Sequence, residues 1–223
     1  MNQYVVVDLE MCKVPYSNRK KEFHGANETI QIGAVLLNEK YEVVDEFNTY
    51  VRPEFGSLDW FITNLTGITS KDLKSAPTMR EAMKAFIAWI PEDAFVVSWS
   101  DNDLKQIQKE AEAKLIEDER LESILATWID CQKMFSERLE EERIFRLSEA
   151  LIAADIIQEG HEHDGLVDAE NTAKLFAKMM LEPELKLNSY FESAHSESSD
   201  SLCFTMGDLF KNLQLAYGGT YNG

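Results

Sequence analysis

The order of its apolar segments is the feature that most constrains the fold of this chain. Strand-like segments come first: a short β-branched run at Tyr4–Val7, a longer one at Thr29–Leu37, and an alternating segment at Tyr41–Val51 that follows the turn signal Asn38-Glu-Lys. Helical and strand-like segments then alternate up to residue 181. A hairpin group followed by strand–helix alternation predicts an α/β protein whose mixed β-sheet is flanked by helices on both faces.

The alternating part is delimited by helix caps and by the spacing of apolar side chains. Thr69 or Ser70 suits the start of a short helical turn, and Thr78 suits the N-cap of a helix that keeps a period of 3.6 residues through Ile90. The remaining expected elements are a strand at Ala94–Trp99, a helix from Asp103 to about Ile116, a short strand at Thr127–Asp130, and helices at Leu147–Ile157 and Asp168–Leu181. Residues 11–28 are polar and rich in turn formers, so we expect a long loop there.

The 223 residues suffice for one α/β domain and a short extension. We expect the domain at residues 1–182 and the extension at 183–223, because the periodic pattern loosens after Pro183. Within the extension, the serine- and acid-rich stretch His195–Asp200 is typical of a linker, and Phe204–Leu215 fits a short docking helix.

The sequence predicts neither a membrane span nor an export signal. The longest apolar runs, such as Ile32–Leu37, are too short to span a bilayer, and the N-terminus lacks the basic and apolar regions of a signal peptide. Cys12, Cys131 and Cys203 share no CxxC spacing, so reduced thiols are the simplest account of them. We therefore expect a cytoplasmic protein that has no membrane partner.

The net charge of −18, from 40 acidic and 22 basic residues, limits the possible partners. A nucleic-acid binder usually carries a basic surface, so this charge argues against tight, non-specific binding to a duplex. Much of the excess lies in blocks such as Glu137–Glu142, which are typical of solvated helix faces. The charge remains compatible with an enzyme whose bound cations hold the end of a single strand.

Acidic residues fall where strands end and helices begin. Asp8 and Glu10 come after the first strand with one residue between them, so their side chains point to the same face, where two carboxylates repel unless cations neutralise them. Asp103 follows the third inner strand at the start of a helix, whereas Asp101 is better suited to capping that helix. Each feature alone is also explained by an exposed strand end or a helix cap. Carboxylates are, however, the ligands that Mg²⁺ and Mn²⁺ prefer.

A histidine and an aspartate flank the start of the last expected helix. His163 lies on the preceding polar loop, and Asp168 lies five residues later on the first turn. A single loop histidine is usually just solvated, but this spacing before an alanine-containing helix is uncommon by chance. His161 lies in the same stretch and is the alternative candidate for a catalytic histidine.

Together these residues resemble, in chain order, the three motifs of the DEDDh-type 3′→5′ exonucleases: Asp8-x-Glu10, then Asp103 with its helix, then His163-x4-Asp168. The resemblance covers roughly residues 4 to 181. It includes the connecting segments Glu28-Thr-Ile-Gln-Ile-Gly-Ala-Val, Thr49-Tyr-Val-Arg-Pro, Leu65-Thr-Gly-Ile-Thr and Ala76-Pro-Thr. Trp99 and the long loop after the first motif look most similar to the KapD-like (sporulation inhibitor) branch and to the histone-mRNA exonuclease branch.

The resemblance implies an RNase H-like fold and a metal-dependent exonuclease that releases 5′-mononucleotides from the 3′ end of a single strand. Two divalent cations, Mg²⁺ or Mn²⁺, would be held by Asp8, Glu10, Asp103 and Asp168, with Asp8 bridging both. His163 would act as the general base.

The sequence departs from the family's pattern beside two of the motifs. Met11 and Cys12 follow the first motif, where threonine is common after the glutamate. Asp164 stands where a basic residue is common, so it either weakens phosphate binding or points outward. Gly165 replaces the usual alanine.

Residues that would contact the substrate are open to two interpretations. The aromatic side chains that either stack on terminal bases or belong to the core are Tyr16, Trp60, Phe61 and Trp99. The best local basic patch, which either contacts the strand or is simply solvated, is formed by Arg19, Lys20 and Lys21.

Two other functions fit parts of the sequence. An inactive nuclease-like fold acting as an interaction module would use the acidic surface and Phe204–Leu215, but such a module has no reason to keep four mutually repelling carboxylates. A hydrolase of very short oligonucleotides would suit the negative charge, and its activity would fall with substrate length. No motif reads the 2′-OH, so the sequence favours neither RNA nor DNA.

Overall fold

The computed structural model describes residues 2–19, 25–189 and 191. Its core is a five-stranded sheet in the order β3-β2-β1-β4-β5. The strands are β1 (Gln3–Lys13), β2 (Asn27–Leu37), β3 (Val43–Tyr50), β4 (Ala94–Ser98) and β5 (Ile129–Asp130). β1 pairs antiparallel with β2 and parallel with β4, and β3 continues the antiparallel group beside β2. The predicted mixed sheet is confirmed.

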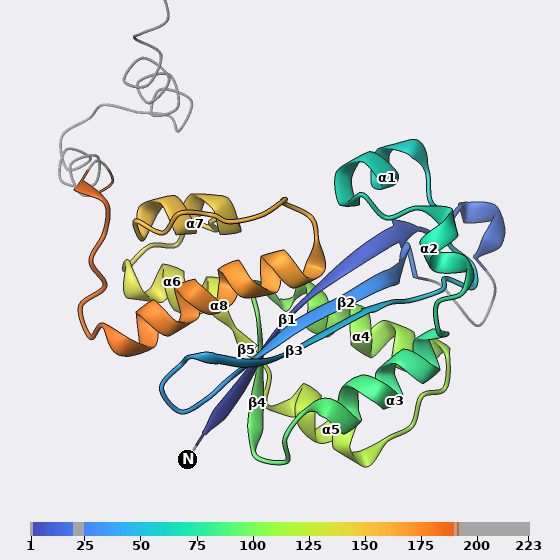
Figure 1. Cartoon of the computed structure of the whole chain (residues 1–223), viewed down its shortest axis with the longest axis horizontal. Coiled ribbons are helices and arrows are strands. Elements are labelled where there is room, and N and C mark those ends of the chain that lie inside the picture. The colour runs from blue at the N-terminus through green and yellow to red at the C-terminus, as the bar shows by residue number, and fades with distance from the viewer. Residues whose placement is uncertain (1, 20–24, 190, 192–223) are drawn as a thin grey trace, which may run out of the picture.

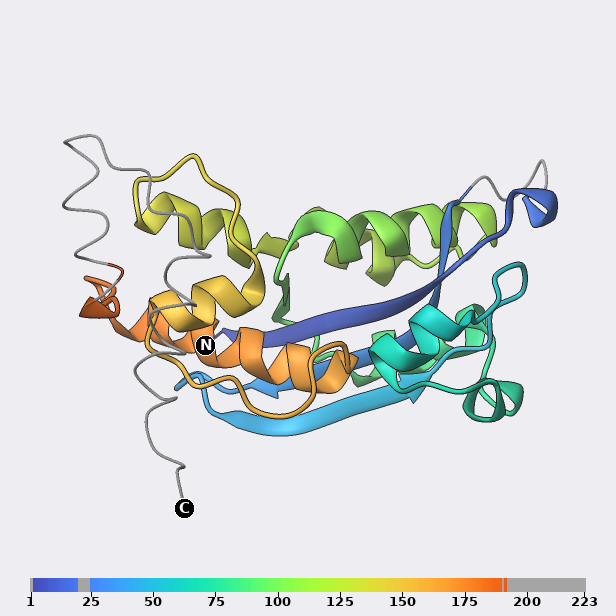
Figure 2. The same cartoon turned by 90° about the horizontal axis from the view of Figure 1, so that it is seen from above.

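Two layers of helices cover the sheet (Figures 1 and 2). One face packs against α6 (Cys131–Arg138), α7 (Leu147–Ala153) and α8 (Gly165–Leu181). The other face packs against α3 (Met79–Trp89), α4 (Asp101–Ala113) and α5 (Glu119–Ala126). Two short helices, α1 (Trp60–Thr66) and α2 (Ser70–Lys74), lie near the end of β1 (Figure 1). The predicted arrangement, with helices on both faces, is therefore confirmed.

The central strand β1 explains how these layers form. Tyr4 and Val6 belong to the cluster on the α8 side, whereas Val5 and Val7 belong to the cluster on the opposite side. The first half of β1 is therefore a continuous apolar run that is buried on both faces. Because side chains alternate along a strand, the even-numbered positions that follow Val6 also face α8.

The predicted loop at residues 11–28 is too long at both ends. β1 continues to Lys13 and β2 begins at Asn27, and the two strands pair along this stretch with one irregularity in register. The connection therefore shrinks to residues 14–26, which include a 3₁₀ turn at Tyr16–Asn18. Cross-strand pairing overrides the polar local composition there.

The predicted N-cap residues begin their helices, with one exception. Thr69 and Thr78 cap α2 and α3 as predicted, each in a capping box. The cap of α4 is Ser100, whose Oγ accepts a hydrogen bond from Asn102 N at 3.4 Å, and the prediction that Asp101 caps this helix is wrong. Asp101 instead pairs with Lys105 one turn later. The sequence pattern missed α1 and most of α6, and the acidic block Glu137–Glu142 is not a helix face beyond Arg138, where α6 ends.

In the described part of the chain, the helices lack the length and apolar character that a membrane crossing needs. Cys12 and Cys131 are buried free thiols. Cys203, the predicted linker at His195–Asp200 and the predicted helix at Phe204–Leu215 lie outside the described residues.

Candidate active site

The first two acidic residues of the site lie on β1. Asp8 and Glu10 have the same parity as Val6, so the strand delivers both carboxylates to the face that α8 covers. Glu10 is 8% exposed, and Asp8 is partly buried. The intervening Leu9 packs into the opposite core. One strand therefore holds two acids side by side and is itself fixed by packing on its other face.

The turn from β4 into α4 brings the third acid to this pair. β4 runs parallel to β1, with Val97 opposite Val6, so the chain leaves the sheet beside the end of the apolar run in β1. Asp103 lies in the first turn of α4 and is 6% exposed. Its Oδ1 accepts a hydrogen bond from Leu9 N at 3.1 Å. This bond ties α4 directly to the backbone between Asp8 and Glu10.

The start of α8 supplies the fourth acid. Asp168 lies in the first turn of α8, and its Oδ2 accepts a hydrogen bond from His163 N at 2.9 Å. Asp164 is the N-cap and accepts from Leu166 N at 3.0 Å and from Gln31 Nε2 at 3.2 Å. Asp164 therefore does not simply point outward; it caps α8 and joins the helix to β2.

Two glycines allow α8 to approach the sheet this closely. A Cβ added to Gly33 on β2 would lie 2.1 Å from Leu166 N and 2.2 Å from Gly165 C. A Cβ added to Gly165 would lie 3.1 Å from Asp8 O. In addition, Gly165 N donates to Gln31 Oε1 at 3.1 Å. The departure from alanine at Gly165 thus fits a direct backbone contact between the helix start and the strand that carries Asp8.

Burial raises the pKa of each of the four carboxyls, and repulsion within the cluster raises the pKa values of Asp8 and Glu10 further. Burial raises the pKa of Asp8 well above its usual range, and the charges of Asp103, Glu10 and Asp168 raise it further. Burial, with the charges of Asp168 and Asp103, raises the pKa of Glu10 to about 8. Burial raises the pKa of Asp103 to about 7 although the Leu9 N–H opposes this, and burial also raises the pKa of Asp168. Four acids that are this difficult to ionise together form a site that cations would stabilise.

The donor geometry also suits a cation. Glu10, His163 and Asp168 each offer one ligand atom, and these three atoms lie within 4.8 Å of one another. Asp8 and Asp103 adjoin them: the charges of Glu10, Asp103 and Asp168 raise the pKa of Asp8, and the charges of Asp168 and Asp103 raise that of Glu10. Hard divalent cations take carboxylate oxygens of this kind. The structure thus brings together all five residues that the sequence singled out.

His163 has a left-handed backbone conformation, which limits the residues that can replace it without strain. It lies on the turn before α8 with a φ of 66°, in the left-handed region where asparagine, aspartate and histidine are the commonest residues after glycine, and its side chain is exposed. His161 is also exposed, and its Nδ1 lies 2.5 Å from Glu162 O. The three-atom donor cluster includes His163 and not His161.

A cavity of about 410 Å³ opens beside this cluster. His163 and Asp168 form part of its wall, and Arg146 supplies a positive charge. Trp99 also lines it, although the side chain is only 8% exposed and packs against Phe135, which favours the core interpretation of this tryptophan. The indole Nε1 of Trp99 is buried and lacks a hydrogen-bond partner among the described residues. Arg146 could not be singled out from the sequence, because it precedes a short helix and belongs to none of the motifs above.

The other predicted aromatic contacts are not core residues. The exposed fractions are 87% for Tyr16, 79% for Trp60 and 56% for Phe61. Of the predicted basic patch, Arg19 is described, whereas Lys20 and Lys21 lie outside the described residues.

Comparison with known proteins identifies exonucleases as the relatives of this chain. The sequence model of the exonuclease family (RNase_T) matches residues 5–176. ERI1 exoribonuclease 2 from Xenopus laevis is 34% identical over 185 residues, which cover 70% of this chain and 26% of the relative. The 3′-5′ exoribonuclease 1 of Rattus norvegicus is 28% identical over 176 residues, which cover 73% of this chain and 50% of the relative. The chain thus spans half or less of the length of these two curated relatives.

The fold has matching solved structures. The nuclease domain of 3′hExo, described as a DEDDh family member bound to rAMP, superposes with a TM-score of 0.68 at 23% identity, over 84% of this chain and 96% of that domain. The cell-death related nuclease 4 (CRN-4) superposes with a TM-score of 0.67 at 20% identity, over 83% of this chain and 66% of that one. These likenesses support the RNase H-like α/β fold.

Proposed function

The chain belongs to the exonuclease family whose sequence model matches residues 5–176, and on that premise we propose that it is a metal-dependent 3′→5′ exonuclease acting on single-stranded nucleic acid. The observation that carries the proposal is the convergence of Asp8, Glu10, Asp103 and Asp168 beside His163. Relatives named as exoribonucleases support the reaction class.

The four carboxylates would hold two divalent cations, Mg²⁺ or Mn²⁺. Asp8 interacts with each of the other three acids, so it would hold cations together with all of them. When bound, the cations would supply Lewis-acid stabilisation of the charge that develops on the scissile phosphodiester. The raised pKa values of Asp8, Glu10, Asp103 and Asp168 fit this role, because a cation would favour the ionised form of each acid.

The protein's own residues position and deprotonate the attacking water. The exposed imidazole of His163 lies beside Glu10 and Asp168, where it accepts the water's proton. The oxygen of this water forms a new bond to phosphorus, and the bond from phosphorus to the 3′ oxygen of the preceding nucleotide breaks. The terminal nucleotide leaves as a 5′-monophosphate, and the shortened strand regains a 3′-hydroxyl after protonation from solvent.

We expect His163→Asn to lower kcat by roughly 100- to 10,000-fold with little change in KM, because removing a general base costs about that much. Asparagine tolerates the left-handed backbone at this position, so the His163 N–H bond to Asp168 is retained. Steady-state kinetics at saturating Mg²⁺ give the measurement. His161→Asn is the matched control and keeps full activity; a larger loss in that variant would reverse the assignment of the two histidines.

The function is tested by digesting 5′-labelled single-stranded RNA and DNA with Mg²⁺ or Mn²⁺. We expect a ladder that shortens from the 3′ end and disappears with EDTA and with Asp103→Ala, and the two sugars are compared in the same assay. Failure to cleave either strand with both metals would contradict the proposal and favour an interaction module. Cleavage restricted to oligonucleotides of two to four residues would instead support a hydrolase of short substrates.

A further inference from the structure

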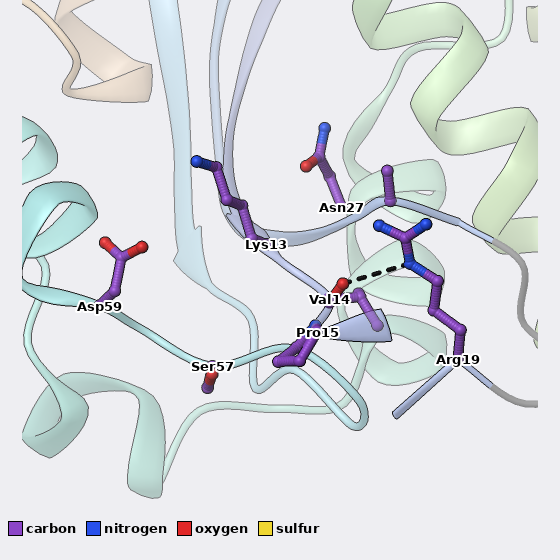
Figure 3. A pocket seen from close by; sticks show the side chains of 8 residues that line it. Lys13, Val14, Pro15, Arg19, Asn27, Ser57 and Asp59 are labelled. Atoms are coloured by element: carbon purple, nitrogen blue, oxygen red, sulfur yellow. Dashed lines mark hydrogen bonds between the residues drawn. The ribbon is translucent and has the colours of Figure 1, made fainter. Parts of the chain in front are cut away.

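A second pocket lies beyond the acids at the end of β1, with a volume of about 490 Å³ (Figure 3). Its wall includes Lys13, the last residue of β1, and Arg19, which follows the 3₁₀ turn. Arg19 Nε donates to Val14 O at 3.3 Å, the dashed line in Figure 3. Among the described residues, neither Lys13 nor Arg19 forms an ion pair with a carboxylate. Within the described part of the chain, two cations therefore line this pocket without a salt-bridge partner.

This local charge is unusual for a chain with a net charge of −18. The pocket has one acidic lining residue, Asp59, and its carboxylate accepts a hydrogen bond from Ile62 N at 2.8 Å as the N-cap of α1. With two cationic side chains and one acidic one, the described lining has a net positive charge. This positive charge is complementary to an anion and not to a cationic peptide.

Two exposed aromatic residues are sequence neighbours of residues that line the pocket. Tyr16 directly follows the lining residue Pro15 and is 87% exposed, and Trp60 directly follows Asp59 and is 79% exposed. The guanidinium of Arg19 lies 5.8 Å from the centre of the Tyr16 ring. A positive groove with aromatic faces is the combination by which proteins bind a single strand without reading its sequence, since phosphates pair with the cations and bases stack on the rings.

The pocket is fixed in place and lies near the acids. Ser57 N donates to Lys13 O at 3.2 Å, and Val14 N donates to Ala26 O at 2.8 Å. The adjoining loop is held by the buried Glu28, whose carboxylate accepts from the backbone N–H groups of residues 54–56. Lys13 is three residues beyond Glu10 on the same strand, which corresponds to about 10 Å at the usual rise of a β-strand.

We propose that this pocket, with Tyr16 and Trp60, binds the substrate strand a few nucleotides away from the 3′ end that lies at the acids. Lys13 and Arg19 pair with backbone phosphates, and Tyr16 and Trp60 stack on bases. This inference rests on the proposed function, because the strand it holds is the substrate of that site. It also explains how an acidic enzyme retains a polyanionic substrate: the strand is held by one compact positive site in addition to the cations at the acids.

The test compares single-stranded 3-mer and 12-mer substrates, with the full chain and Mg²⁺. We expect Lys13→Gln/Arg19→Gln to lower kcat/KM at least roughly tenfold on the 12-mer and to leave the 3-mer unchanged. Each lost contact between a cation and a single-strand phosphate also removes about 0.7 from the slope of log affinity against log salt, so the double variant loses about 1.4. Affinity is measured by anisotropy with a 12-mer whose 3′-terminal linkages are phosphorothioates that resist hydrolysis.

Two matched variants separate charge from other effects. Lys40→Gln/Lys84→Gln removes two exposed cations in the β2–β3 turn and on α3 and keeps wild-type kinetics. Lys13→Arg/Arg19→Lys keeps the charge and restores affinity for the 12-mer. Trp60→Phe removes the quenching of tryptophan fluorescence that the 12-mer causes in the wild type. Wild-type cleavage together with an unaffected Lys13→Gln/Arg19→Gln variant overturns this inference alone, whereas a wild type that cleaves no strand overturns the proposed function.

Discussion

Replacing Asp8 with asparagine is expected to lower kcat by at least about 1000-fold, which corresponds to roughly 4 kcal/mol in the barrier. Asp8 interacts with Glu10, Asp103 and Asp168 at once, so its loss removes the ligand that would be shared by both cations. Asparagine has nearly the same size and keeps one oxygen, so the loss is in charge and not in packing. Asp103 is a less specific target, because its carboxylate also accepts the Leu9 N–H bond that holds α4 to β1.

The same substitution is expected to stabilise the protein in EDTA. Because the folded-state pKa values of these carboxyls are raised, their contribution to stability is complete below the usual pKa of a carboxylic acid. It is lost as the pH rises through about 7 for Asp103 and about 8 for Glu10. Removing the Asp8 charge relieves part of this repulsion, so the melting temperature in EDTA at pH 8 should rise by at least about 2 °C.

Thermal melts at pH 5 and pH 8, with EDTA or Mg²⁺, measure this effect. We expect Mg²⁺ to stabilise the wild type more at pH 8 than at pH 5, and to stabilise Asp8→Asn much less than the wild type. Asp101→Asn is the control, since Asp101 is in the same region but is paired with Lys105 on the surface of α4. Retention of more than a tenth of wild-type kcat by Asp8→Asn would contradict the assigned role of Asp8.

The sequence predicts the layers of the fold and the positions of the acids because both depend on short-range patterns. An apolar run that ends in Asp8-x-Glu10 indicates a strand end with two carboxylates on one face, and the structure has this arrangement. An acid just after the β4 strand indicates a helix start beside the sheet, as Asp103 shows. Strand and helix periodicities are properties of neighbouring residues, so they are visible without any knowledge of the fold.

Features that depend on distant pairing escape such patterns. The extension of β1 to Lys13 depends on its partner β2, and the surrounding residues alone resemble a loop. Trp60 and Trp99 have the same side chain in unremarkable local sequences, yet one is exposed and the other is buried in the core. Arg146 reaches the active-site cavity only because α7 packs beside α8. Each of these outcomes is decided by which elements meet in space.

The contact between Gly33 and Gly165 is a further feature of this kind, and it leads to a second large expected effect. Gly33→Ala should destabilise the protein by at least about 3 kcal/mol, more than most overpacked substitutions, because the added Cβ meets backbone atoms and not flexible side chains. The nearest atoms, Leu166 N and Gly165 C, belong to the first turn of α8. The strand β2 lies inside the sheet and is paired on both sides, so α8 has to move.

This displacement of α8 would lower the catalytic rate as well as the stability of the fold. The first turn of α8 carries Asp168, and the turn before it carries His163, so a shift of α8 separates both from Glu10. We expect Gly33→Ala to lose at least about 100-fold in kcat at a temperature where it is still folded, since an error of about 1 Å in placement can cost that much. Urea unfolding and kinetics on the same sample measure both quantities.

Gly67→Ala is the control: its φ of 74° predicts a cost of about 1–2 kcal/mol, but its added Cβ meets nothing within 4 Å, so kcat stays unchanged. A fully active Gly33→Ala enzyme would show that α8 can move away from β2 without disturbing the acids, and that the position of Asp168 is set by other contacts.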